Sequence, residues 1–148
     1  MYKRQVLRGA LQRGGYYLEA PQDGRPVFCL PWSHDGAPAT LLGTTETAYA
    51  GDPGAAAPQA QEIDYLLAVF GHYFPQRAHD HGAILDSFAG LRVLPLADGA
   101  FASRSRETVL HTGPGARPRV LSILGGKLTT HRVTAARALA RLRPALGR

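Results

Sequence analysis

Short apolar runs separated by turn-forming residues fill the first third of the chain. Residues 15–20 (GYYLEA) and 26–32 (PVFCLPW) flank a Pro-Gln-Asp-Gly turn, and residues 39–45 (ATLLGTT) follow a second turn at 33–38 (SHDGAP). An Asp-Gly pair between such runs is a strong hairpin signal. The pattern therefore predicts three antiparallel strands joined as a meander.

A helical spacing of apolar residues follows a loop rich in Gly, Pro and Ala. The apolar positions fall at i, i+3, i+4, i+7 and i+11, and they are Ile63, Leu66, Leu67, Phe70 and Phe74. Glu62 and Asp64 would lie in the first turn, where the helix dipole favours acidic side chains, and Pro75 would end the helix. The spacing predicts an amphipathic helix with one face on a core.

The second half of the chain alternates between apolar runs and polar turns. We expect a long strand over residues 84–96 (ILDSFAGLRVLPL), broken near Gly90, and shorter strands over 104–111 (RSRETVLH) and 119–124 (RVLSIL). An alanine- and arginine-rich run from about 128 to 142 predicts a closing helix. The predicted class is α+β, an antiparallel sheet with a packed helix, followed by a C-terminal strand-turn-helix.

The first fifteen residues are basic and have only weak helical periodicity, at Val6, Leu7, Ala10 and Leu11. No core partner for them is evident in the pattern. We therefore expect residues 1–15 to be a poorly packed start.

Length and composition indicate a globular chain. Its 148 residues, 45% of them apolar, suffice for one domain with a real core. No run approaches the roughly 18 apolar residues of a membrane span, and the N-terminus lacks the apolar region of a signal peptide. We expect a cytoplasmic chain, or one bound peripherally to the inner face of a membrane. Cys29 stands in an apolar run and is expected to be a small buried hydrophobe.

The net charge of +6 comes from fifteen arginines and two lysines against eleven acidic residues. Such a balance is typical of proteins that bind nucleic acid or an anionic surface. The arginines are scattered, however, and no basic motif with interleaved aromatic residues occurs. We do not expect a nucleic-acid partner, and a positive field that attracts a small anionic substrate explains the charge as well. A small non-enzymatic binding module with a basic surface remains an alternative.

His79-Asp80-His81 has the composition of a metal site without its spacing. Two histidines two residues apart share one side of a strand but not of a helix, and no third ligand is evident nearby. A solvated loop explains the segment, and no metal is expected.

The segment 124–132, LGGKLTTHR, has the residues of a site for negative charge. Gly125 and Gly126 let the backbone approach a ligand closely, Lys127 brings a cation, and the unpaired N–H groups at the start of the following helix favour an anion or an electron-rich carbonyl. It is not the phosphate loop of nucleotide hydrolases, because Leu128 follows the lysine. The local pattern alone is equally compatible with an ordinary strand-to-helix turn. Arg92, a charge in an apolar run, is a second candidate anion ligand.

The order of these motifs is that of a known flavoprotein family. The chain carries, in sequence, PVFCLPW, LLGTTE, GDP, QEIDYLLAVFGHYFP, SFAGLRVLP, SRETVL and ILGGKLTTHR. From about Tyr16 to Leu142 it closely resembles the C-terminal half of FAD-dependent glycerol-3-phosphate dehydrogenase, a member of the D-amino-acid-oxidase-like group. That family oxidises sn-glycerol 3-phosphate to dihydroxyacetone phosphate, passes a hydride to FAD and sends the electrons to a quinone at the membrane.

The resemblance also implies which residues form the site. Its cofactor-binding segment corresponds to residues 125–130, so the residues expected to bind FAD are Gly125, Gly126, Lys127, Leu128, Thr129 and Thr130. Arg92, Arg106 and Lys127 are expected to bind the substrate phosphate or hold the substrate over the flavin, with Arg92 and Lys127 the two expected to take part in catalysis. A guanidinium fork and an ammonium group both suit a phosphate dianion.

The chain departs from the family pattern in three respects. His131 stands where the family has Tyr, Glu46 where it has Asp, and the G-x-G-x-x-G motif of the family's N-terminal half does not occur. We therefore expect a fragment with a substrate domain at 16–118 and the last strand and helix of an FAD domain at 119–148, whose missing partner is the N-terminal FAD-binding half. A relative acting on another hydroxy acid or an amine is the alternative within the group.

Overall fold

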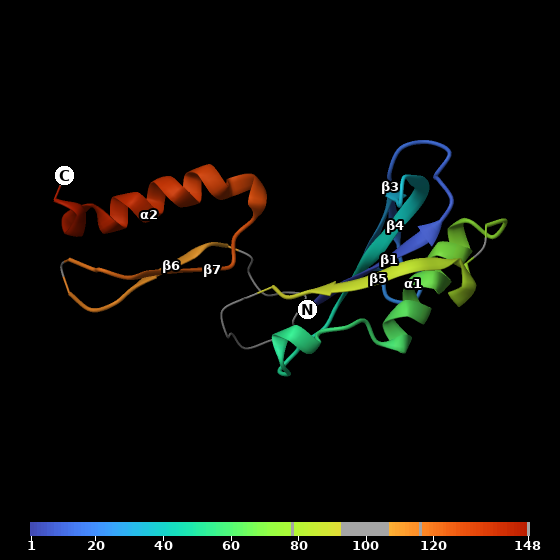
Figure 1. Cartoon of the computed structure of the whole chain (residues 1–148), viewed down its shortest axis with the longest axis horizontal. Coiled ribbons are helices and arrows are strands. Elements are labelled where there is room, and N and C mark those ends of the chain that lie inside the picture. The colour runs from blue at the N-terminus through green and yellow to red at the C-terminus, as the bar shows by residue number, and fades with distance from the viewer. Residues whose placement is uncertain (78, 93–106, 116, 148) are drawn as a thin grey trace. The chain divides into compact units, whose positions relative to one another are not determined.

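The structure, a computed structural model, describes residues 1–77, 79–92, 107–115 and 117–147. The chain separates into two compact units, Met1–Leu91 and Arg92–Arg148, which are treated in turn below (Figure 1).

The first unit contains a five-stranded antiparallel sheet. Its strands are β1 (Tyr2–Arg8), β2 (Tyr16–Glu19), β3 (Pro26–His34), β4 (Ala37–Glu46) and β5 (Ile84–Gly90), in the order β2-β3-β4-β1-β5. Strands β2, β3 and β4 form the predicted meander. Asp35 and Gly36 join β3 to β4 with φ angles of 49° and 77°, the conformation that a two-residue hairpin turn requires. Asp23 and Gly24 lie in the turn between β2 and β3, where Gly24 has a φ angle of 71°, so the predicted Asp-Gly hairpin turn is confirmed as well.

Helix α1 (Ala60–Tyr73) packs against one face of this sheet and confirms the predicted amphipathic helix. Glu62 accepts a hydrogen bond from the backbone N–H of Gln59 at 3.2 Å, which satisfies one of the N–H groups at the helix start. The core beneath the helix joins α1 to β1, β2, β3 and β4, and its buried members are Leu7, Leu18, Ala20, Val27, Cys29, Leu42, Leu66, Leu67, Val69 and Phe70. The helical spacing of apolar residues thus correctly predicted which side of α1 packs on the core.

The prediction of a poorly packed start is wrong for residues 2–8. They form β1, an inner strand hydrogen-bonded to β4 on one side and β5 on the other. Leu7 lies in the core beneath α1, Val6 belongs to a second cluster with Ala39 and Leu41, and the Lys3 ammonium pairs with Glu62 of α1. An inner strand buries side chains on both faces, so the neighbouring residues Val6 and Leu7 are both apolar. This pair breaks the alternation typical of a strand and resembles the spacing of a helix.

The second unit is a strand pair followed by a helix. Strand β6 (Val109–Thr112) pairs with β7 (Leu121–Leu124) in antiparallel register, and a 3₁₀ turn (Leu128–Thr130) leads into α2 (His131–Leu146). The predicted last strand and helix are present. Because β6 pairs with β7, residues 109–112 belong with the C-terminal unit, and the units meet at 91/92 rather than at 118/119. The parts of the predicted strands at 93–96 and 104–106 lie outside the described residues.

Helix α2 buries none of its described residues. Val133, Leu139 and Leu146 keep 59%, 61% and 59% of their surface exposed, so the apolar residues of this helix are largely uncovered within the described part of the chain. Within the described ranges, no helix combines the length and hydrophobicity needed to cross a lipid bilayer. The α+β class is confirmed.

Candidate functional site

The turn between β7 and α2 depends on two consecutive glycines. Gly125 and Gly126 have φ angles of 69° and 90°, in the left-handed region that side chains disfavour. A Cβ atom on Gly126 would lie 2.7 Å from Thr108 Oγ1. The backbone angle therefore favours glycine at position 126, and a side chain there would have to displace the Thr108 hydroxyl group.

The next residues close a single 3₁₀ turn. The Lys127 carbonyl accepts hydrogen bonds from the Thr130 N–H at 3.0 Å and from Thr130 Oγ1 at 2.9 Å. His131 Nδ1 lies 2.8 Å from the carbonyl oxygen of Leu128. These bonds fix the path of the backbone as it enters α2.

The N-terminus of α2 has no side-chain cap. The side chains of Lys127, before the 3₁₀ turn, and Thr130, before α2, make no capping hydrogen bond. The first turn of the helix has no acidic residue. Helix starts are normally stabilised by such groups, because their first N–H groups and the helix dipole carry positive charge. This helix start can therefore favour an external anion or carbonyl oxygen.

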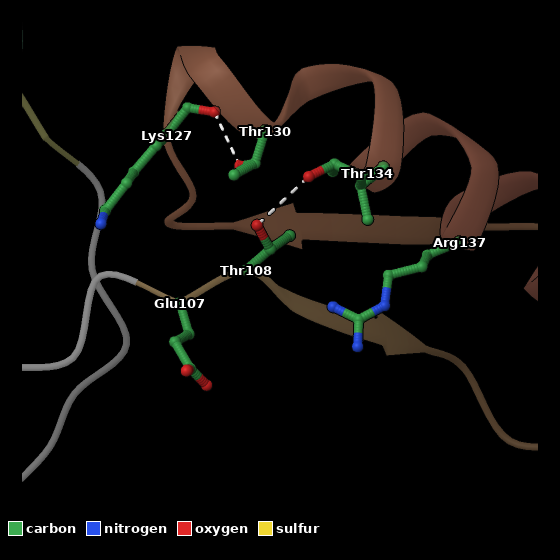
Figure 2. A pocket seen from close by; sticks show the side chains of 7 residues that line it. Glu107, Thr108, Lys127, Thr130, Thr134 and Arg137 are labelled. Carbon is green, nitrogen blue, oxygen red and sulfur yellow. Dashed lines mark hydrogen bonds between the residues drawn. The ribbon is translucent and has the colours of Figure 1, made fainter.

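A hollow of about 620 Å³ lies beside this turn, within the second unit. It is lined by Glu107, Thr108, Lys127, Thr130, Val133, Thr134 and Arg137. Figure 2 shows the hydroxyl groups of Thr108 and Thr134 pointing toward each other, with Lys127 at one end of the lining and Arg137 at the other. The lining combines two cations, one carboxylate and three hydroxyl groups, so it suits a polar, predominantly anionic ligand.

The structure brings together some of the predicted site residues. The six from Gly125 to Thr130 form the turn, and Lys127 and Thr130 line the hollow. Arg92 is half-buried, follows β5 by two residues and is not among the lining residues. Arg106 lies outside the described residues.

Sequence reasoning missed Thr108, Thr134 and Arg137. Thr134 and Arg137 follow Thr130 at i+4 and i+7, so helical spacing alone could have placed both on its face. No local signal identifies Thr108, because its position depends on the pairing of β6 with β7.

The other candidate groups have structural partners. His81 Nε2 lies 2.6 Å from Asp64 Oδ1, and His79 Nδ1 lies 2.7 Å from the Arg77 carbonyl oxygen. The Cys29 side chain is fully buried, and burial raises the pKa of its thiol to about 12. The prediction of a buried, unreactive cysteine is therefore confirmed.

Comparison with known proteins gives a consistent result. Residues 3–132 match the family model described as DAO, FAD dependent oxidoreductase. The chain is 37% identical over 145 residues to aerobic glycerol-3-phosphate dehydrogenase of Escherichia coli (strain K12), covering 94% of this chain and 27% of the relative. It is 39% identical over 135 residues to glycerol-3-phosphate dehydrogenase of Pseudomonas aeruginosa, covering 86% and 25%. D-erythritol 1-phosphate dehydrogenase of Brucella abortus is 35% identical over 130 residues, again covering 86% and 25%.

A solved structure is similar as well. The glycerol-3-phosphate dehydrogenase from Bacillus halodurans, complexed with FAD, matches with a TM-score of 0.73 and 27% identity, over 99% of this chain and 26% of that one. The chain thus spans about a quarter of the length of these relatives. The family model covers most of the chain, and the chain belongs to the FAD-dependent oxidoreductase family.

Proposed function

We propose that this chain is part of a flavoprotein that oxidises sn-glycerol 3-phosphate to dihydroxyacetone phosphate, with hydride transfer to FAD and electrons passed to a quinone. The observation that carries the proposal is the Gly125-Gly126-Lys127 turn at the uncapped start of α2. It lies inside the family match, in a chain similar to dehydrogenases of this name. Family membership favours an enzyme over a basic binding module.

The described residues fit one edge of the cofactor. A Cβ atom on Gly126 would meet the Thr108 hydroxyl group, and no side chain caps the helix start behind it. Residues 125–130 would hold the electron-rich edge of the flavin through backbone N–H groups other than that of Thr130, which bonds to the Lys127 carbonyl. When bound, FAD supplies the ring that accepts the hydride. Fixed N–H dipoles favour negative charge that develops in front of them, without reorganisation.

The substrate side of the site would be cationic. Lys127 is exposed at the end of the glycine turn and can place its ammonium group beside a phosphate. Arg92 and Arg106 would supply bidentate hydrogen bonds to the same dianion. In this assignment Lys127 and Arg92 also orient the carbon that loses the hydride.

A quinone acceptor and a peripheral position on the inner, cytoplasmic face of a membrane belong to the same proposal. The resemblance to the family supports both. The N-terminal FAD-binding half would be a further partner of this chain, because the relatives are about four times as long as the matched part.

A second candidate is a dehydrogenase for another phosphorylated polyol. The similarity to D-erythritol 1-phosphate dehydrogenase favours it, at 35% identity over 130 residues. Both candidates need the same phosphate site and differ in the length of the carbon chain. Comparison of glycerol 3-phosphate with erythritol phosphate as substrates separates them.

The proposal is tested by reconstitution. The chain is purified alone and with a separately expressed N-terminal half of a related dehydrogenase, and both samples are assayed for bound FAD and for glycerol-3-phosphate-dependent dye reduction. Activity only in the mixture supports the proposal. Tight FAD binding by the chain alone would contradict the assignment of most of the cofactor site to the N-terminal half. A mixture that binds FAD but reduces no dye with either polyol phosphate would contradict the substrate assignment.

Replacement of Lys127 tests the phosphate assignment in that active mixture. We expect Lys127→Ala and Arg92→Ala each to raise the KM for glycerol 3-phosphate by about tenfold to a hundredfold, the range for loss of a charged hydrogen bond. The KM for an unphosphorylated polyol should change much less. Arg119→Ala is the matched control, because Arg119 is an exposed cation of the same unit that does not line the hollow. Equal losses for both substrates would refute a phosphate contact.

A further inference from the structure

Three segments of the second unit meet at one hydroxyl group. Thr108 lies just before β6, Gly126 lies in the turn after β7, and Thr134 lies in the first turn of α2. Thr108 Oγ1 is 3.3 Å from Thr134 Oγ1 and 2.7 Å from the position that a Cβ atom on Gly126 would take. Figure 2 shows the hydroxyl groups of the two threonines pointing toward each other.

The hydroxyl pair differs from the other hydroxyl contact of the site. Thr130 Oγ1 bonds to the Lys127 carbonyl three residues earlier, which is a local contact within one turn. The Thr108–Thr134 contact spans 26 residues and is half-buried. It is therefore a tertiary link between the start of the strand pair and the start of the helix.

We propose that Thr108 and Thr134 are positioning residues that hold the Gly126–Lys127 turn against the start of α2. One atom of Thr108 makes both contacts. Its Oγ1 lies within hydrogen-bond distance of Thr134 on the helix and also occupies the space beside Gly126. As a β-branched residue, threonine has few χ1 rotamers, so its hydroxyl is held in place at little entropic cost. The consequence for flavin and substrate binding rests on the proposed function, whereas the mechanical role does not.

The mechanical role predicts faster local opening when the hydroxyl is removed. Thr108→Val keeps the branched shape and deletes the hydroxyl, and Thr108→Ser keeps the hydroxyl. In the 148-residue chain we expect Thr108→Val to accelerate hydrogen exchange of the amides of residues 126–130 by about threefold to tenfold, as expected for one lost hydrogen bond. Thr108→Ser should leave these rates within about twofold of the parent chain.

Two further variants keep this test decisive. Thr112→Val is the matched control, because Thr112 lies on β6, is half-buried and has no side-chain hydrogen bond within the described part of the chain. Thr134→Val removes the other hydroxyl group of the pair and should accelerate exchange as Thr108→Val does. It also provides the test if Thr108→Val does not fold. Exchange rates in Thr108→Val and Thr134→Val equal to those in Thr112→Val would overturn the proposal.

A spectroscopic measurement then tests the functional consequence in the reconstituted flavoprotein. The probe is sulfite, whose addition to a flavin leaves negative charge on the ring. We expect its affinity to fall by about fivefold in Thr108→Val and to be retained in Thr108→Ser. Unchanged sulfite affinity in Thr108→Val would overturn the functional role. A parent mixture that binds no FAD would instead contradict the proposed function and leave the exchange result standing.

Discussion

The Cys29 thiol lies in the core between β3 and α1, out of contact with solvent. Burial disfavours the charged thiolate and raises the pKa of this thiol from 9.0 to about 12. We expect no reaction with a soluble disulfide reagent at pH 8 until the chain is unfolded in urea. Rapid labelling of the folded chain would contradict the burial of this strand.

The same thiol contributes a pH dependence with a defined sign. Because the folded pKa is above the unfolded value, the unfolded chain loses its proton first as the pH rises. The contribution of Cys29 to stability is complete below about pH 9 and is lost as the pH rises toward about 12. Cys29→Ala should remove this part of the alkaline loss of stability, measured by urea unfolding between pH 8 and 11.

The backbone conformation of Gly126 makes this position sensitive to substitution. Gly126→Ala places a side chain at a φ angle of 90° and against Thr108 Oγ1, and should reduce the local free energy of opening by about 1–3 kcal/mol. Gly113→Ala is the control, because no atom lies within 4 Å of its added Cβ atom. Hydrogen exchange of the α2 amides measures both. Equal exchange in the two variants would show that position 126 tolerates a side chain.

Among the elements, helix α1 is fixed to the β2–β3 turn by a polar contact as well as by its apolar face. Tyr65 of α1 donates a hydrogen bond to Asp23 Oδ1 at 2.8 Å, and Arg25 donates to Oδ2 at 2.7 Å. Partial burial disfavours the Asp23 carboxylate, but these hydrogen bonds outweigh that effect and hold its pKa below the usual range. The contact between helix and hairpin is therefore strongest while Asp23 is ionised.

Tyr65→Phe tests this contact through its pH dependence. Since the folded pKa is lowered, the stabilisation is present above the usual pKa of about 4 and is lost as the pH falls further. We expect the variant to lose about 1 kcal/mol at pH 7 and to show a shallower loss of stability between pH 5 and 3. Tyr49→Phe removes a hydroxyl bonded to a backbone carbonyl and should leave the pH profile unchanged. Parallel pH profiles for Tyr65→Phe and the parent chain would exclude the coupling.

Sequence patterns correctly predicted the elements whose structure depends on residues close together in the chain. Asp-Gly turns and helical spacing located the meander and α1, because φ angles at a turn and the apolar face of a helix depend on neighbours in the sequence. Strand β1 was missed, since it becomes an inner strand only by pairing with β4 and β5, which come later in the chain. For the site, the glycine turn was found from its own residues, whereas Thr108 reaches it only through strand pairing.

At the scale of the whole molecule, the two units differ in how much they bury. The first contains the core beneath α1, with Leu66, Val69 and Phe70 at most 1% exposed. In the second, the apolar residues of α2 are all at least partly exposed within the described part of the chain. Buried apolar area is the main stabilising term, so the units should not be equally stable.

Hydrogen exchange of the whole chain tests this difference. We expect amides of β1, β4 and α1 to exchange at least about a hundredfold more slowly than those of α2, which corresponds to almost 3 kcal/mol of extra opening free energy. Addition of the N-terminal half of a related dehydrogenase should slow exchange in α2 and change β1 and β4 little. Equal protection in both units of the isolated chain would refute the inequality.

The uncapped start of α2 also has a thermodynamic consequence. A helix that has Arg132 and no acidic residue in its first turn places a positive side chain at the positive end of its own dipole. A negatively charged ligand bound there would act as the missing cap, so part of its binding free energy would be spent on ordering the helix. Ligand affinity and helix stability are then linked quantities, and saturation with such a ligand raises the melting temperature of the segment that holds it.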